Sequence, residues 1–140
     1  MDRFTRNYTI VLGLAGLAVL LWIFYEDPQI AALNDLLGND AQVSAYPYHF
    51  RVVDVRNGVV TMSSPRSSEF PAYRALELLY PRLANRTPDD PEMLQAQQDL
   101  AEIQQRAKQI VMALGEVKSV RWQLDHDWLN WHGVQLRPHY

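Results

Sequence analysis

The stretch YTIVLGLAGLAVLLWIFY, residues 8–25, contains 18 residues and no charged side chain. As an α-helix rising about 1.5 Å per residue it is roughly 27 Å long. This length approaches the hydrocarbon core of a bilayer, which is about 30 Å thick. The sequence therefore predicts a single transmembrane helix. It divides the rest of the chain into an N-terminus (1–7), an α+β domain (26–126) and a Trp-rich C-terminal tail (127–140).

The charges that flank the predicted span indicate its orientation. Arg3 and Arg6 precede it, whereas Glu26 and Asp27 follow it. Because basic residues beside a span tend to remain in the cytoplasm, we expect a cytoplasmic N-terminus and a periplasmic domain at the bacterial inner membrane. The alternative is a cleaved signal peptide, which requires small residues after the apolar stretch. The bulky residues 22–25 end the stretch instead, which favours an uncleaved anchor.

Two groups of residues in the span are candidates for packing against other molecules. Small side chains in its inner half let a second helix approach closely, so they predict contact with a partner's membrane helix; the alternative is a plain anchor. Amphipathic rings at its outer end suit the headgroup level of the bilayer. The small residues are Gly13, Ala15, Gly16 and Ala18, and the rings are those of Trp22 and Tyr25.

Composition excludes several kinds of site in the predicted domain. With Asp2, Arg3 and Arg6 set aside, residues 26–140 carry 15 acidic and 11 basic side chains, without a block of like charge. We therefore expect no binding of nucleic acid. The chain has no cysteine, which excludes disulfides, thiolate metal ligands and a cysteine nucleophile.

The first half of the domain predicts a helix followed by a hairpin. Asp27 can cap a helix over residues 27–39, which Gly38 would end. Residues 46–62 predict two strands joined by the pair Asn57-Gly58, which favours a type I′ turn. The apolar face of the helix consists of Ile30, Leu33, Leu36 and Leu37, and the first strand has an irregularity at Val53 and Asp54.

The second half predicts two helices and a third strand. Residues 71–83 predict a helix that ends near Pro81. Residues 92–114 predict a long helix with a heptad stripe, which packs either on the domain's own sheet or on a helix of another chain. We favour the sheet, because three heptads are the lower limit for a coiled coil. Residues 116–125 predict a strand. The stripe consists of Met93, Ala96, Leu100, Ile103, Ala107, Ile110 and Leu114, and the apolar side of the strand consists of Val120, Trp122 and Leu124.

These elements predict an αββαβ-like domain, in which helices cover a three-stranded sheet and residues 71–91 form an inserted helix. In this order the domain resembles the BON domain, a small module of bacterial periplasmic and outer-membrane proteins. The matching segments are DPQIAALNDLL (27–37), FRVVDVRNGVVTMSS (50–64) and AEIQQRAKQIVMALGEVKSVRWQL (101–124). The chain departs from the family in its inserted helix, its tail, and Ser63 and Ser64, where BON domains usually have glycine. The resemblance implies envelope attachment, contacts with phospholipid or envelope proteins, and no catalysis.

Three groups of polar residues are candidates for a chemical site. Arg66, in the loop 63–69, is a possible contact for an anion, although an ordinary strand-to-helix connection is favoured. A metal site would require Asp125, His126, Asp127 and His132 to converge, but the side chains of consecutive residues diverge. Serines 63, 64, 67 and 68 with His49 show none of the motifs of a hydrolase. We expect the protein to have no enzymatic activity and to bind no metal and no cofactor.

The aromatic residues Trp128 and Trp131 are three positions apart, on one face if their segment is helical. Exposed, they would dock on lipid headgroups or on a partner; the alternative is a short helical turn covering the core. The sequence thus favours a non-enzymatic accessory or scaffolding subunit of a larger inner-membrane complex. The alternative is a BON-like domain that binds phospholipid or other envelope components.

Overall fold

The computed structural model describes residues 2–24 and 27–136. It contains helices and strands in mixed order, which confirms the predicted α+β class. The helices are α1 (Arg3–Ile23), α2 (Pro28–Asn39), α3 (Ala41–Ala45), α4 (Ala72–Leu79), the 3₁₀ turn η1 (Pro81–Leu83), α5 (Pro91–Met112) and α6 (His126–Trp131). The strands are β1 (Val52–Arg56), β2 (Val59–Ser64) and β3 (Ser119–Leu124).

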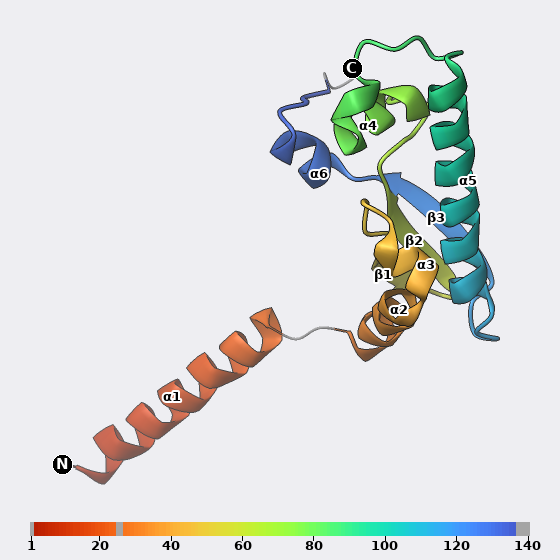
Figure 1. The fold of residues 1–140 in the computed structure, drawn as a ribbon. Helices are drawn as coiled ribbons and strands as arrows, with labels where there is room; N and C mark the ends of the chain where they lie inside the picture. The colour runs from red at the N-terminus through yellow and green to blue at the C-terminus, as the bar shows by residue number, and fades with distance from the viewer. Residues whose placement is uncertain (1, 25–26, 137–140) are drawn as a thin grey trace.

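Helix α1 lies apart from the other elements (Figure 1). None of its residues is buried. It is the one helix within the described residues that is long and apolar enough to cross a membrane, judged by length and composition. The domain therefore does not use α1 as part of its core.

The three strands form one sheet in the order β1-β2-β3. β1 and β2 are antiparallel, and β2 and β3 are parallel. Asn57 and Gly58 have φ angles of 52° and 80°, so the predicted type I′ turn is confirmed. The register shifts between Val52 and Asp54, which confirms the predicted irregularity as a bulge.

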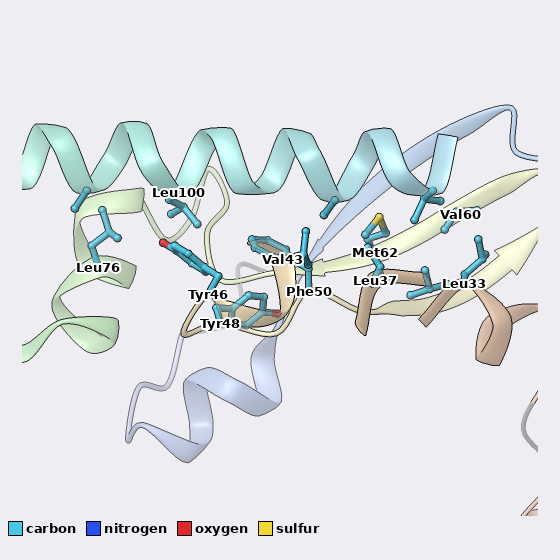
Figure 2. Packing of buried hydrophobic residues seen from close by; sticks show 14 of the residues in the cluster. Leu33, Leu37, Val43, Tyr46, Tyr48, Phe50, Val60, Met62, Leu76 and Leu100 are labelled. Carbon is cyan, nitrogen blue, oxygen red and sulfur yellow. The ribbon is translucent and has the colours of Figure 1, made fainter. Parts of the chain in front are cut away.

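The core lies between one face of the sheet and the helices α2 and α5. Val52, Val60 and Met62 point into it from the strands, and Leu33 and Leu37 from α2. Figure 2 shows these layers, with α5 running along one side of the cluster. The opposite face of the sheet is largely exposed. Its exposed side chains are Arg51, Val53, Arg56, Val59, Ser119, Arg121 and Gln123.

The predicted stripe of α5 does pack within the domain. However, the residues that are buried are not all those that were predicted. Gln104 and Val111 are buried, whereas Ile103 and Ile110 are only half-buried and Leu114 is exposed. A strict heptad assumes 3.5 residues per turn, whereas a straight helix has 3.6, so the buried line drifts by one position. The buried residues are Met93, Ala96, Leu100, Gln104, Ala107 and Val111.

Other boundaries also differ from the prediction. α2 continues through Gly38 to Asn39, and Leu36 on this helix is 40% exposed rather than part of its buried face. The unpredicted helix α3 follows at once, because Asp40 caps it by accepting a hydrogen bond from the Val43 N–H. The predicted end of α4 near Pro81 is confirmed.

The edge of the sheet at β1 is closed by a side chain from α2. The Asn34 amide donates to the Val52 carbonyl at 3.1 Å and accepts from the Val52 N–H at 2.7 Å. Asn34 thus replaces the partner strand that β1 lacks on this side. The bulge beside Val52 further interrupts the edge.

Replacing Asn34 with alanine removes both of these hydrogen bonds and leaves a partly buried N–H without a partner. We expect N34A to lower the free energy of unfolding by about 2 kcal/mol. The matched control is D35A on the exposed side of the same helix, which should change it by less than about 0.5 kcal/mol. Urea unfolding of the full chain in detergent measures both, and equal effects would contradict this role of Asn34.

A second link joins the start of α3 to α5. The Asp40 carboxylate accepts two hydrogen bonds from the Arg106 guanidinium, at 2.8 and 2.9 Å. Arg106, with a contribution from the Val43 N–H, lowers the pKa of Asp40 from 3.8 to about 2. The charged carboxylate therefore stabilises the fold above pH 4, and this contribution is lost as the pH falls from about 4 to 2.

The variant D40N keeps an oxygen that can cap α3 but loses the charge. At pH 7 we expect D40N to unfold at a lower urea concentration than the natural chain, and near pH 2 the two should unfold together. R106Q should behave in the same way, because it removes the other half of the pair. A difference between D40N and the natural chain that is the same at pH 7 and pH 2 would contradict the assignment.

Candidate functional site

A cleft lies on the exposed face of the sheet, where β1 begins and β3 ends. Its volume is about 300 Å³. An adjoining pocket continues it towards His49 and Trp128, and the two share Arg51, Asp125 and Asp127. The main cleft is lined by Arg51, Val53, Ser63, Gln123, Leu124, Asp125, His126 and Asp127.

Arg51 and Ser63 form the fixed rim of the cleft. The Ser63 N–H donates to the Arg51 carbonyl at 2.9 Å, and the Arg51 N–H donates to the Ser63 hydroxyl at 3.3 Å. The hydroxyl group belongs to a residue that is only 3% exposed, whereas Arg51 itself is exposed. The backbone of Arg51 is thus held in place while its guanidinium remains accessible.

The opposite rim is organised by Asp125. One carboxylate oxygen accepts from the Tyr48 hydroxyl at 2.8 Å, and the other accepts from the Trp128 N–H at 3.1 Å and so caps α6. Burial, together with the neighbouring Asp125, raises the pKa of Tyr48 well above its usual value of 10. Tyr48 therefore remains a neutral hydrogen-bond donor over the physiological pH range.

The cleft thus presents one exposed cation, Arg51, and one exposed carboxylate, Asp127, on a hydrogen-bonded frame. Such a pair can orient a polar group of a ligand or partner that carries both a donor and an acceptor. Among its described residues, the cleft shows no nucleophile held by a base. His49 and Ser63 lie on neighbouring parts of the frame, but no hydrogen bond joins them within residues 27–136.

The four candidate metal ligands, Asp125, His126, Asp127 and His132, do not converge. Asp125 is engaged by Tyr48 and Trp128, and the Nδ1 atom of His132 lies 2.8 Å from the Trp128 carbonyl oxygen. Among the described residues, no group of three or more histidine and carboxylate side chains is placed to hold a metal ion.

Arg66, the possible anion contact, is engaged within the fold. Its Nε donates to the side-chain oxygen of the buried Gln104 at 3.0 Å. The Ser64 hydroxyl donates to the Arg66 carbonyl, and the Ser67 hydroxyl accepts from the Glu69 N–H. The loop therefore has the hydrogen bonds of the ordinary strand-to-helix connection that the sequence favoured.

The two tryptophans of the tail lie in different surroundings. Trp128 is half-buried, with its ring 5.3 Å from the ring of Tyr48. Trp131 is 88% exposed. Between them Leu129 is buried with Phe70, so the described part of the tail is attached to the domain through α6. The expected turn of helix over the core is present, and only Trp131 is available for docking.

The small residues of α1 do not form a single face. In a helix, Gly13 and Gly16 lie close together, whereas Ala15 and Ala18 lie on the opposite side. A methyl group added at either glycine would meet no neighbouring atom within 4 Å. The glycine pair is therefore an open, shallow surface. Trp22 is 79% exposed, and Tyr25 lies outside the described residues.

Comparisons with known proteins add no relative. No family model matches the chain, and no curated protein and no solved structure matches it. The resemblance to BON domains accordingly remains a prediction.

Sequence reasoning missed the cleft because its residues come from three separate segments. Arg51 and Ser63 are neighbours only through the hairpin register, and Tyr48 and Asp125 are 77 positions apart. One signal was present: the alternation of β3 places Arg121 and Gln123 on the face opposite to Val120 and Trp122, which marks that face as polar.

Replacing Tyr48 with phenylalanine tests the frame of the cleft. Because the lost hydrogen bond ends on a carboxylate, we expect Y48F to lower the free energy of unfolding by about 1.5–2 kcal/mol. The matched control is Y73F, since the half-buried Tyr73 makes no side-chain hydrogen bond to another described residue. In the D125N background the effect of Y48F should shrink. An undiminished effect there would show that the hydroxyl does not act through Asp125.

Proposed function

We propose that this protein is a non-enzymatic, membrane-anchored accessory or scaffolding subunit of a larger complex in the bacterial inner membrane. The observation that carries the proposal is the complete exposure of α1, an apolar helix that the domain leaves uncovered. Monomeric soluble proteins rarely expose an apolar surface of this extent. A bilayer, together with a helix of a partner, supplies the missing cover.

The short connection between α1 and α2 supports a role close to the membrane. Only residues 24–26 separate the end of α1 from Asp27, whose side chain caps α2. Because an extended chain spans no more than about 3.6 Å per residue, this connection spans at most roughly 14 Å. The domain is consequently held near the bilayer surface, where it can dock on the exposed part of a membrane complex.

The orientation in the proposal rests on charge. Arg3 and Arg6 lie at the N-terminal end of α1, and Asp27 lies beyond its C-terminal end. Basic residues at the end of a span favour the cytoplasmic side, which leaves the domain in the periplasm.

The glycine pair of α1 provides the sharpest test of docking in the membrane. G13L/G16L makes the helix more apolar but fills the open surface, so it should remain in the membrane fraction and lose its stoichiometric partner in mild detergent. A15L/A18L makes matched changes on the opposite side and should keep the partner. A natural chain that purifies as a clean monomer, or equal effects of the two variants, would contradict docking through this face.

A second candidate function is the binding of phospholipid by a BON-like envelope domain. Exposed Trp131 favours it, because an exposed indole suits the headgroup level of a bilayer. Both candidates share the anchor and differ in what the domain contacts.

Fluorescence quenching tests this second candidate. The variant W22F lacks the tryptophan of the anchor, and it is placed in vesicles whose lipid headgroups carry a quencher. If the domain touches lipid, the remaining emission should be quenched, and the further change W131F should abolish most of that quenching. W22F emission that the labelled headgroups leave unchanged would exclude lipid contact at Trp131.

A further inference from the structure

The two edges of the sheet differ in how well their backbone groups are protected. At β1, the Asn34 amide and the bulge at Val53 close the edge. At β3 no comparable device is found among the described residues. An unprotected edge strand is a ready template for pairing with another strand, and proteins normally protect such edges unless they are used.

The hydrogen bonds of β3 show which backbone groups are unused. The Asp125 N–H donates to the Ser64 carbonyl at 2.9 Å, and the Ser119 N–H donates to the Gly58 carbonyl at 3.4 Å. In a strand, alternate residues direct their N–H and C=O groups to the same side. Residues 119, 121 and 123 therefore face β2, whereas Val120, Trp122 and Leu124 direct their backbone groups to the open edge.

The side chains beside this edge are incompletely covered. Val120 and Trp122 point towards the core but remain half-buried, unlike the buried Val60 and Met62 opposite them on β2. A further strand at the edge would complete the cover of both. Within the described residues, the edge thus lacks hydrogen-bond partners, and its two apolar side chains are covered by the core on one side only.

We propose that β3 pairs with β3 of a second copy of this chain, antiparallel about a two-fold axis, so that two three-stranded sheets become one of six strands. The inference goes beyond the proposed function and stands whether or not α1 lies in a membrane. In this arrangement the same edge serves both copies, as a two-fold interface requires.

The register centred on Trp122 satisfies the edge and its charges. Because the outward backbone groups belong to even-numbered residues, Trp122 faces Trp122 of the other copy, and Arg121 lies opposite Gln123. The neighbouring register, with Arg121 opposite itself, is disfavoured because it places like charges face to face. In the chosen register no two like charges lie directly opposite each other, since Arg121 is the one charged residue of β3.

The charges beyond the ends of β3 agree with this choice of partner. The exposed Lys118 precedes the strand, and the carboxylates of Asp125 and Asp127 follow it. Antiparallel pairing brings the basic start of one strand towards the acidic end of the other. Lys118 and Asp127 form no salt bridge with another described residue. The second copy thus offers complementary charge at both ends of the interface.

Disulfide trapping tests the register. Because the chain has no natural cysteine, only the introduced cysteines can form a disulfide. Arg121 and Gln123 would form a non-hydrogen-bonded pair with Cα atoms about 4.5 Å apart, which a disulfide can span. Differently tagged R121C and Q123C full-length chains, mixed in mild detergent and oxidised, should give the mixed dimer as the main product. S119C alone should stay monomeric, because its copies would lie roughly 20 Å apart, six residues along the strand.

Two exposed substitutions test the same interface at equilibrium without risk to the core. Q123E places a carboxylate opposite Arg121 and should strengthen dimerisation about fivefold, whereas Q123K should weaken it about fivefold. Sedimentation of the full chain in detergent measures both. A natural chain that is monomeric at all concentrations, a dominant R121C homodimer, or equal trapping of S119C would each overturn the proposal. A different protein trapped on β3 in place of the second copy would also overturn it.

Discussion

The apolar surface of α1 needs an environment that the other described residues do not supply. Its leucine, isoleucine and valine side chains are more than half exposed, and burying one such side chain fully is worth about 1.5–3 kcal/mol. Summed over the helix, this driving force exceeds the net stability of an ordinary domain. The medium that covers this helix therefore decides which other surfaces of the molecule remain accessible.

Hydrogen bonds join α2 and α3 to the sheet and to α5. Asn34 joins α2 to β1, and Asp40 joins the start of α3 to Arg106 on α5. These contacts fix the sheet and α5 relative to α2 and α3, the elements that follow the anchor in the sequence. The exposed sheet face, its cleft and the open edge of β3 belong to this one body, so a partner can engage them together.

Local chemistry made part of this fold predictable. The pair Asn57-Gly58 predicts its own turn, and Asp27 with Pro28 predicts the start of α2, because these signals act over a few residues. The burial of the polar Gln104 on α5 was not predictable, because the partner of its side chain, Arg66, is 38 positions away. The cleft failed to appear for the same reason, since Tyr48 and Asp125 meet only in the folded chain.

Cysteine labelling across the membrane tests the central claim most directly, because the natural chain has no cysteine. The exposed Ser68, in the loop that follows β2, and Asn7, near the start of α1, lie on opposite sides of the proposed span. A maleimide that cannot cross the inner membrane should label S68C in intact spheroplasts, and N7C only after they are lysed. Labelling of N7C in intact spheroplasts, or protection of S68C until lysis, would contradict the account.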